Sequence, residues 1–215
     1  MLHNDVEEMI YREIWYNEDY NLNTSKESIV IDIGMNAGFA TLFFAQKDFV
    51  KKVYAFEPDK IMYEKAVNNI NLNAHIKDKI VTANVACSNE DKKEIYVVNP
   101  IESAGIAKRR GKKLTDVKQI EVACVDSAKV LGTIIDNHYG REKILIKCDC
   151  EGAEYEIFFR LEEMGYFEKI DAVVMEWHAD RRKEIENIFI RNDYTYMIYN
   201  NPGRTFGKCY AIKGR

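Results

Sequence analysis

Two short clusters of titratable residues are candidates for proton chemistry: the first contains three acids, and the second contains one acid and a histidine. Asp149, Glu151 and Glu154 lie in CDCEGAE, and Glu176 and His178 lie in MEWH. A carboxylate or an imidazole can remove the proton from a hydroxyl, which is a poor nucleophile until that proton leaves. Glu176 and His178 are two residues apart, so an extended backbone projects both to one side. We therefore expect a catalytic group made of Asp149, Glu151, Glu176 and His178.

The same side chains have alternative roles. Carboxylates with a histidine could hold Mg²⁺ or another divalent ion that polarises a hydroxyl, and His178 could act as a general base near neutral pH. Three ligands in one geometry are not visible in a sequence, so we assign no metal ligand. Glu154 could simply favour the first turn of its helix, and Glu176 could cap a neighbouring helix. The other histidines, His3, His75 and His138, do not follow an acid at the end of an expected strand and are read as exposed or structural.

A glycine turn follows the first apolar run, in VIDIGMNAGFATL. Gly34 and Gly38 allow the chain to turn tightly and bring its backbone close to a ligand. The dinucleotide fingerprint G-x-G-x-x-G would need glycine where Asn36 and Phe39 stand, and the Walker pattern lacks its Lys-Ser or Lys-Thr. The observed pattern, D-x-G-x-N-x-G-F, suits a ligand with a cationic amino-acid end and a nucleoside but no phosphate.

An acidic residue also ends the next apolar run, in AFEPD. A carboxylate at this place, Glu57, can accept both hydrogens of a ribose diol. Pro58 offers an apolar edge to an adenine, and Asp32 could order the glycine turn or meet an ammonium group. Together these residues favour a nucleoside ligand over an empty tight turn.

Alternating strands and helices would position these residues. We expect strands at 28–33, 52–56, 80–86, 144–148 and 172–176, and a closing hairpin of 194–199 and 208–212. Helical faces begin at Phe39, at Asp59, near Tyr155 and at Asp180. Strands that are apolar on both faces and spaced by helices indicate a parallel sheet, in which ligands bind at the carboxyl ends. Gly34, the first acidic cluster and the second would then share one edge.

Two segments depart from this alternation. Residues 90–125 contain strand-like pieces at 94–98 and 119–125 around SAGIAKRRGKK, which predicts an inserted hairpin. The basic stretch 108–113 is read either as a solvated loop tip or as a binding site for an anionic acceptor. Residues 1–27 form an N-terminal helical extension whose Trp15, Tyr16 and Tyr20 pack on the core or line an acceptor pocket. We expect one domain over residues 1–215.

Composition narrows the function classes. The chain has 215 residues, 47% hydrophobic and 31% charged, with a net charge of −4, which argues against binding nucleic-acid backbones as its main task. No apolar run approaches the roughly 20 residues that span a bilayer, and the start lacks a signal-peptide layout. Five cysteines without a C-x-x-C indicate reduced thiols and a cytoplasmic location, with a metal-binding role for the Cys148–Cys150 pair as the remote alternative.

Five segments together resemble the FkbM family of S-adenosylmethionine-dependent methyltransferases: IDIGMNAGF, VYAFEPD, NVACSNEDKKE, LIKCDCEGAEYEIF and VVMEWH. The resemblance covers about residues 29–212. It implies an α/β, doubly wound, mostly parallel seven-stranded sheet of order 3-2-1-4-5-7-6, with strand 7 antiparallel and helices on both faces. The sequence departs from the family pattern at Cys148 and Cys150, where aliphatic residues are more common. Its N-terminal extension is also short for a lid over an acceptor.

The resemblance also implies the cofactor, S-adenosyl-L-methionine. We expect it to be held by the glycine turn, by the second strand's tip, by the end of the third strand near adenine, and by the first acidic cluster. These residues are Asp32, Gly34, Met35, Asn36, Gly38, Phe39, Glu57, Pro58, Ala86, Cys87, Ser88 and Asp149.

The expected activity is methyl transfer to a hydroxyl of a small molecule or sugar, and the preference for oxygen comes from the resemblance. An RNA (tRNA) methyltransferase is the main alternative. The net negative charge and the absence of an N-P-P-Y type motif speak against it, so we expect neither a nucleic-acid nor a membrane partner. A non-catalytic, cofactor-binding interaction domain is the third reading, and the acids at both strand ends speak against that one.

Overall fold

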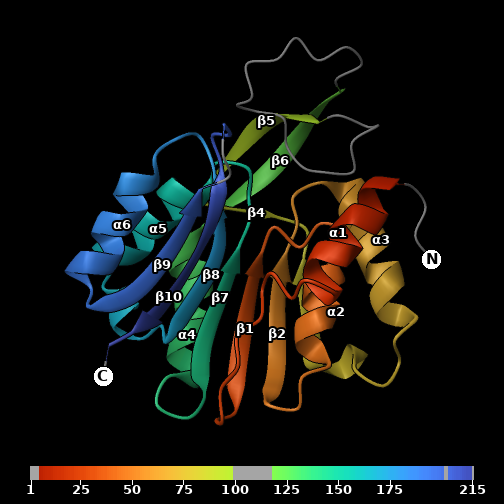
Figure 1. The fold of residues 1–215 in the computed structure, drawn as a ribbon. Coiled ribbons are helices and arrows are strands. Elements are labelled where there is room, and N and C mark those ends of the chain that lie inside the picture. The colour runs from red at the N-terminus through yellow and green to blue at the C-terminus, as the bar shows by residue number, and fades with distance from the viewer. Residues whose placement is uncertain (1–4, 99–117, 201–202, 215) are drawn as a thin grey trace.

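The computed structural model describes residues 5–98, 118–200 and 203–214. Its main sheet has seven strands in the order β3-β2-β1-β7-β8-β10-β9 (Figure 1). The strands are β1 (Ser28–Ile33), β2 (Val50–Phe56), β3 (Ile80–Ala83), β7 (Lys143–Cys148), β8 (Ala172–Trp177), β9 (Tyr194–Asn200) and β10 (Gly207–Lys213). Neighbouring strands from β3 to β8 pair in parallel, and β10 is antiparallel to both β8 and β9.

The expected mostly parallel sheet with an antiparallel strand near its edge is thereby confirmed. The strand numbers differ in detail from the expected order, because three further strands lie between β3 and β7 in the chain. These are β4 (Ala86–Ser88), β5 (Lys92–Val98) and β6 (Lys118–Asp126), and they form a second sheet of order β4-β6-β5. Once these three are set aside, the expected and observed orders correspond strand for strand.

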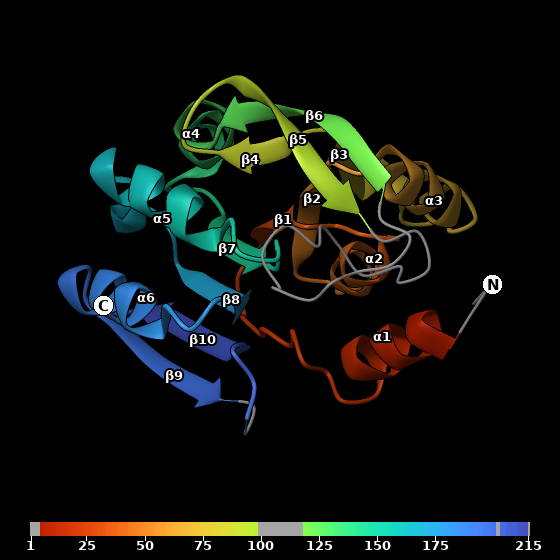
Figure 2. The same ribbon diagram turned by 90° about the horizontal axis from the view of Figure 1, so that it is seen from above.

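Helices cover both faces of the main sheet (Figures 1 and 2). One face carries α1 (Asp5–Trp15), α2 (Phe39–Ala45) and α3 (Lys60–Asn71), and the other carries α4 (Ser127–His138), α5 (Glu154–Glu163) and α6 (Arg182–Arg191). Strand β1 has apolar residues on both of its faces: Ile29, Ile31 and Ile33 belong to the core under α4–α6, whereas Val30 belongs to the core under α1–α3. No helix in the described ranges is both long and apolar enough to cross a bilayer.

The single strand expected at 80–86 is wrong, because the structure divides this segment between two sheets. Strand β3 ends at Ala83, and Ala86–Ser88 leaves the main sheet to pair in parallel with β6. The side chain of Asn84 marks the break, because its amide donates to the carbonyl oxygens of Glu57 (2.8 Å) and Pro58 (3.1 Å). Strands β5 and β6 pair antiparallel like the expected hairpin. The basic stretch 108–113 lies outside the described residues.

Helix α4 was not expected from the sequence. It begins after Asp126, whose side chain accepts a hydrogen bond from the backbone N–H of Ala128 (2.9 Å), as an N-cap does. Leu131 and Ile135 are fully buried in the core beneath it. Gly132 lies between them, and a Cβ at this position would meet the Tyr166 ring at 2.3 Å. Close packing against Tyr166 therefore requires glycine at position 132, although glycine weakens the helical pattern in the sequence.

Candidate active site

The turn between β1 and α2 is shaped by its neighbour, the end of β7. Gly34 has φ +83°, and a Cβ on it would lie 1.8 Å from the carbonyl oxygen of Asp149. The backbone N–H groups of Gly34 and Met35 both donate to the carbonyl oxygen of Phe56, at 3.1 and 2.9 Å. Asn36 adopts the left-handed region, with φ 52°, and its side-chain oxygen accepts from the backbone N–H of Ala37 (2.6 Å). The first glycine is thus required by the close approach of a neighbouring strand end.

Glu57 ties this turn to the tip of β2. Its two carboxylate oxygens accept hydrogen bonds from the backbone N–H groups of Asn36 and Asp59, both at 2.8 Å. The side chain is buried, and burial raises its pKa to about 7, although the two N–H donors lower it. The carboxyl group of Glu57 therefore lines the space beside the turn with lone pairs left to accept further hydrogen bonds.

Beneath the turn lies a buried charge pair. Lys147 is 3% exposed, and its Nζ lies 3.0 Å from Oδ1 of Asp32 and donates to the carbonyl oxygen of Gly34 (2.6 Å). Burial lowers the lysine's pKa, but Asp32 and Asp149 outweigh burial and raise it. Asp32 also accepts a hydrogen bond from Thr41 (2.5 Å). Asp32 therefore orders the turn from below, the first of its two expected roles.

A cavity of about 310 Å³ opens above the carboxyl ends of β1, β2 and β7. Nine of the expected cofactor residues line it: Gly34, Met35, Asn36, Phe39, Glu57, Pro58, Ala86, Cys87 and Asp149. The other three, Asp32, Gly38 and Ser88, are absent from its walls, and Ser88 is fully buried in β4. Cavity residues that the sequence did not suggest include Lys147 and Lys208.

The cavity has an excess of negative charge. Among the described residues that line it are seven carboxylates, Glu13, Asp19, Glu57, Asp149, Glu151, Glu156 and Glu176, against two lysines. Both lysines are already paired, Lys147 with Asp32 and Lys208 with Asp19. Such a site favours a cationic ligand and disfavours a phosphate, because like charges brought into a half-buried space repel.

The N-terminal segment forms one wall of the cavity. Ile10 and Ile14 of α1 line it, and the hydroxyl of Tyr20 donates to Oδ2 of Asp149 (3.0 Å). Asp19 is held by an ion pair with Lys208 and by a hydrogen bond to its carbonyl oxygen from Tyr210 (2.6 Å). The short extension therefore reaches across the sheet edge.

The three aromatic residues of the extension take different positions. Trp15 packs on Phe43 with ring centroids 5.6 Å apart, and Tyr16 is 76% exposed. Of the three, Tyr20 lines the cavity. Only one of them thus takes the position expected of an acceptor-pocket residue.

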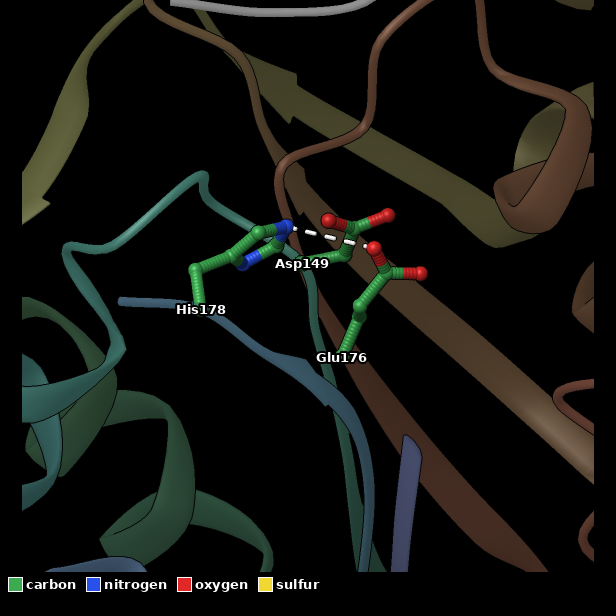
Figure 3. A group of neighbouring side chains, drawn as sticks. All are labelled: Asp149, Glu176 and His178. Atoms are coloured by element: carbon green, nitrogen blue, oxygen red, sulfur yellow. Dashed lines mark ion pairs between the residues drawn. The ribbon is translucent and has the colours of Figure 1, made fainter. Parts of the chain in front are cut away.

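The predicted catalytic residues converge at the opposite wall. Figure 3 shows Asp149 beyond the end of β7, with Glu176 and His178 from β8 and the residue after it. One ligand atom from each of these three residues lies within 4.8 Å of the other two. Nε2 of His178 lies 3.2 Å from Oε1 of Glu176 and 3.6 Å from Oε2 of Glu151. Glu151 has a left-handed backbone, with φ 55°, in the turn that brings it there.

His178 is held firmly in this cluster. Its Nδ1 lies 2.9 Å from Oε1 of Glu154, a fully buried carboxylate at the start of α5. The hydroxyl of Tyr155 donates to the His178 carbonyl oxygen, and the Phe206 ring stacks on the imidazole with centroids 6.1 Å apart. Glu154 therefore does more than favour a helix terminus.

The ionisation of His178 follows from these neighbours. Burial lowers its pKa, but the carboxylates of Glu154 and Glu176 outweigh burial and raise the pKa to about 11. A histidine with that pKa is protonated at neutral pH and is a poor general base. The geometry thus does not favour the proton-removing role that the sequence suggested for His178. Burial and the nearby Asp149 raise the pKa of Glu176, while His178 lowers it.

The thiols near the site are structural. Cys148 and Cys150 have Sγ atoms 3.2 Å apart, and all five cysteines of the chain are free. Burial raises the pKa of the Cys148 thiol, which keeps it protonated and unreactive.

A second hollow adjoins the first beyond Glu176. Its walls carry the aromatic side chains of Tyr199, Phe206 and Tyr210, together with Glu13, Asp19, Glu176 and Lys208. Glu176 therefore stands between two spaces, one beside Glu57 and the glycine turn and one lined by aromatic rings.

Comparison with known proteins decides the family. The model of the Methyltransferase FkbM domain matches residues 32–197, a segment that contains the glycine turn, Glu57 and both acidic clusters. The chain belongs to the FkbM methyltransferase family. This confirms the resemblance drawn from the sequence segments. Methyltransferase sdnD of Sordaria araneosa is 27% identical to this FkbM-family chain in an alignment of 192 residues, and the match covers 79% of this chain and 74% of sdnD.

Solved structures share the fold of this FkbM-family chain. Methyltransferase FkbM from Methylobacillus flagellatus KT superposes with a TM-score of 0.60 at 16% identity, covering 94% of this chain and 47% of that protein. The chain thus spans about half the length of that relative. An rRNA methylase from Streptococcus thermophilus gives a TM-score of 0.52 at 15% identity, covering 100% of this chain and 99% of the methylase. TrmK from M. capricolum, solved with S-adenosyl-homocysteine, gives a TM-score of 0.54 at 10% identity, covering 93% of this chain and 67% of TrmK.

Proposed function

We propose that this protein transfers a methyl group from S-adenosylmethionine to a hydroxyl of a small molecule or sugar. The observation that carries the proposal is the position of Asp149 and Glu176. Both carboxylates line the cavity that contains the glycine turn and Glu57, and Glu176 also lines the aromatic hollow beyond it. Proton-accepting groups thus lie between a space suited to the cofactor and a space suited to an acceptor.

The lining of the cavity suits the cofactor in its charge and in the side chains that it offers. Glu57 would accept the ribose hydroxyls, and the turn from Gly34 to Asn36 would bring backbone beside the amino-acid end. Pro58, Ala86 and the neighbouring Cys87 give an apolar wall for the adenine. The acidic excess of the lining suits a ligand that carries an ammonium and a sulfonium. When bound, S-adenosylmethionine supplies an electrophilic methyl group on an excellent leaving group.

The aromatic hollow indicates the class of acceptor. Three aromatic side chains line it together with four charged ones, and aromatic side chains with polar groups are common in sites for small organic molecules. Its one lysine, Lys208, is paired with Asp19, and Glu13 and Glu176 add negative charge. A neutral, hydroxyl-bearing acceptor can enter such a hollow, whereas a phosphorylated one would be repelled.

The chemistry asked of the protein is alignment and proton removal. The acceptor oxygen forms a bond to the methyl carbon as the carbon–sulfur bond breaks, and its proton passes to the carboxylate of Asp149 or Glu176. The products are a methyl ether, S-adenosylhomocysteine and a protonated carboxylate. Tyr20 holds Asp149 in place through its hydroxyl, and the buried pair below the turn keeps the rim of the cavity rigid.

RNA is the second acceptor class to test, because proteins named as an rRNA methylase and TrmK share this fold. A radiolabelled-methyl assay with separate panels of sugars, hydroxylated small molecules and bulk RNA separates the two. We expect label in a neutral hydroxyl acceptor, with kcat lowered at least about 100-fold by Asp149→Asn.

Two controls make this assay decisive. Calorimetry should show S-adenosylhomocysteine binding that Glu57→Ala weakens strongly, and Glu64→Gln, an exposed acid on α3, should change neither binding nor rate. Absence of S-adenosylhomocysteine binding would overturn the proposal. Label confined to RNA would replace it with the RNA alternative.

A further inference from the structure

We propose that Asp149, Glu176 and His178 bind a divalent cation beside the cofactor cavity. One oxygen of each carboxylate and one imidazole nitrogen lie within 4.8 Å of one another. Ligands around a Mg²⁺-sized ion sit at about 2.1 Å and therefore about 3–4 Å apart, so small side-chain rotations suffice. Two of the three, Asp149 and Glu176, also line the cavity, which leaves the cation open to an acceptor oxygen or water.

A buried imidazole nitrogen points into this cluster. His178 is 6% exposed, and Figure 3 shows its ring directed toward Asp149 and Glu176. Nε2 lies 3.2 Å from Oε1 of Glu176, yet it makes no well-directed hydrogen bond with any residue that the structure describes. A buried polar atom without a well-directed partner is costly, and a bound ion would satisfy it.

Glu154 orients that nitrogen. Its Oε1 accepts a hydrogen bond from the backbone N–H of Cys150 (3.1 Å) and lies 2.9 Å from Nδ1 of His178. Because an ionised carboxylate only accepts, Nδ1 is the donor. When a cation displaces the proton on Nε2, that nitrogen presents its lone pair to the cluster. A carboxylate that holds the far nitrogen of a histidine is the usual support of a metal-binding imidazole. Glu154 is a positioning residue in this arrangement.

The charge balance also calls for a cation. Asp149, Glu151, Glu154 and Glu176 surround one imidazole, and the nearby Lys147 and Lys208 are neutralised by Asp32 and Asp19. A proton on His178 offsets one of the negative charges, whereas a divalent ion in its place offsets two. One imidazole with carboxylates and open positions suits Mn²⁺ or Mg²⁺ with water as the remaining ligands.

The catalytic role of the cation rests on the proposed function. Binding of the cation to the protein is independent of that function. An acceptor hydroxyl coordinated to the cation would lose its proton more easily, because the positive charge stabilises the alkoxide. The test therefore measures binding directly. Chelator-treated protein is titrated with Mn²⁺, and the fall of the free-ion electron paramagnetic resonance signal gives affinity and stoichiometry. We expect one site per chain.

Variants locate the site. Glu176→Gln and Asp149→Asn should each weaken Mn²⁺ binding at least about tenfold, and Glu154→Gln should weaken it about 10–100-fold while leaving all three ligands in place. Glu64→Gln, on the surface of α3, is the matched control and should leave it unchanged. In proton NMR, substoichiometric Mn²⁺ should broaden the ring signals of His178 and spare the exposed His75.

Two results would overturn the proposal. The first is absence of Mn²⁺ binding by protein that still binds S-adenosylhomocysteine in calorimetry, which would leave the proposed function intact. The second is Mn²⁺ binding that Glu176→Gln and Asp149→Asn do not change, which would place the ion elsewhere. Loss of S-adenosylhomocysteine binding in the wild-type protein is instead a failure of the proposed function.

Discussion

At the scale of single residues, Lys147 links the two strands that carry the site. It is buried in β7, where the surrounding residues of ILIKC are apolar, and it reaches Asp32 and the carbonyl oxygen of Gly34 in β1 and its turn. Such a buried pair is tolerated when both charges are partnered. A lysine inside an apolar strand is a visible signal that sequence reasoning passed over. Its partner, by contrast, depends on which strands become neighbours.

Lys147→Met should therefore destabilise the protein by about 3–5 kcal/mol, because it leaves the Asp32 carboxylate buried beside Thr41 without its cation. Urea unfolding measures the free energy. The double variant Asp32→Asn with Lys147→Met should lose less than the single lysine variant, since no unpaired charge remains. A single-variant loss below about 1 kcal/mol would show that the pair does not hold the turn.

Glu57 predicts a pH dependence of stability. Its pKa is about 7 in the folded protein and near 4.5 when exposed, so between these values the folded state holds a proton that the unfolded state has lost. Stability from this group must then fall as pH rises from about 4.5 to about 7, by at most about 3 kcal/mol. Thermal unfolding of wild-type and Glu57→Gln protein from pH 4.5 to 8 checks this. The stability of the wild type should fall relative to that of Glu57→Gln as pH rises, and a difference that does not change with pH would contradict the prediction.

At the scale of elements, the sequence predicted the regular parts well. Strand β1 occupies the predicted residues, because a mostly apolar run of β-branched residues has few other interpretations. The break after Ala83 was missed, since Val85 and Ala86 resume the apolar pattern after Asn84, and the pairing of Ala86–Ser88 with β6 depends on a distant segment of the chain. Helix α4 was missed although Asp126 and the Leu131–Ile135 spacing signal it, because Gly132 interrupts the pattern.

The turn after β1 gives a prediction at this scale. Gly34→Ala should destabilise far more than Gly140→Ala, although both glycines have φ near +82°. At Gly140 nothing lies within 4 Å of the added Cβ, so the cost is the left-handed backbone alone, about 1–2 kcal/mol. At Gly34 the Cβ would meet the Asp149 carbonyl oxygen at 1.8 Å and push β1 and β7 apart. Equal losses in chemical denaturation would mean that the strand ends are not in close contact.

At the scale of the whole molecule, the site is assembled from distant parts of the chain. Tyr20 contacts Asp149 across 129 positions, and Asp19 contacts Lys208 across 189. Sequence reasoning placed the acids and the glycine turn on one edge, because parallel strands share their carboxyl ends. It offered a pocket-lining role for the N-terminal extension as one of two alternatives, but it could not predict which residues of α1 would line the cavity or that β10 would complete the walls, since nothing local in either segment records its partner. The acidic lining follows from that assembly.

This distribution of charge predicts how salt affects the reaction. The net charge is −4 and the cavity lining is acidic, so the proposed neutral acceptor binds without displacing counterions. Its kcat/KM should change less than about twofold between roughly 50 and 200 mM NaCl, whereas a protein gripping 6–10 phosphates of a nucleic acid loses about 10³–10⁵ in affinity over that range. Initial rates with the acceptor found in the labelling assay give the slope. A steep fall would require basic groups in contact with phosphate, and RNA would then account for the activity better than a neutral hydroxyl does.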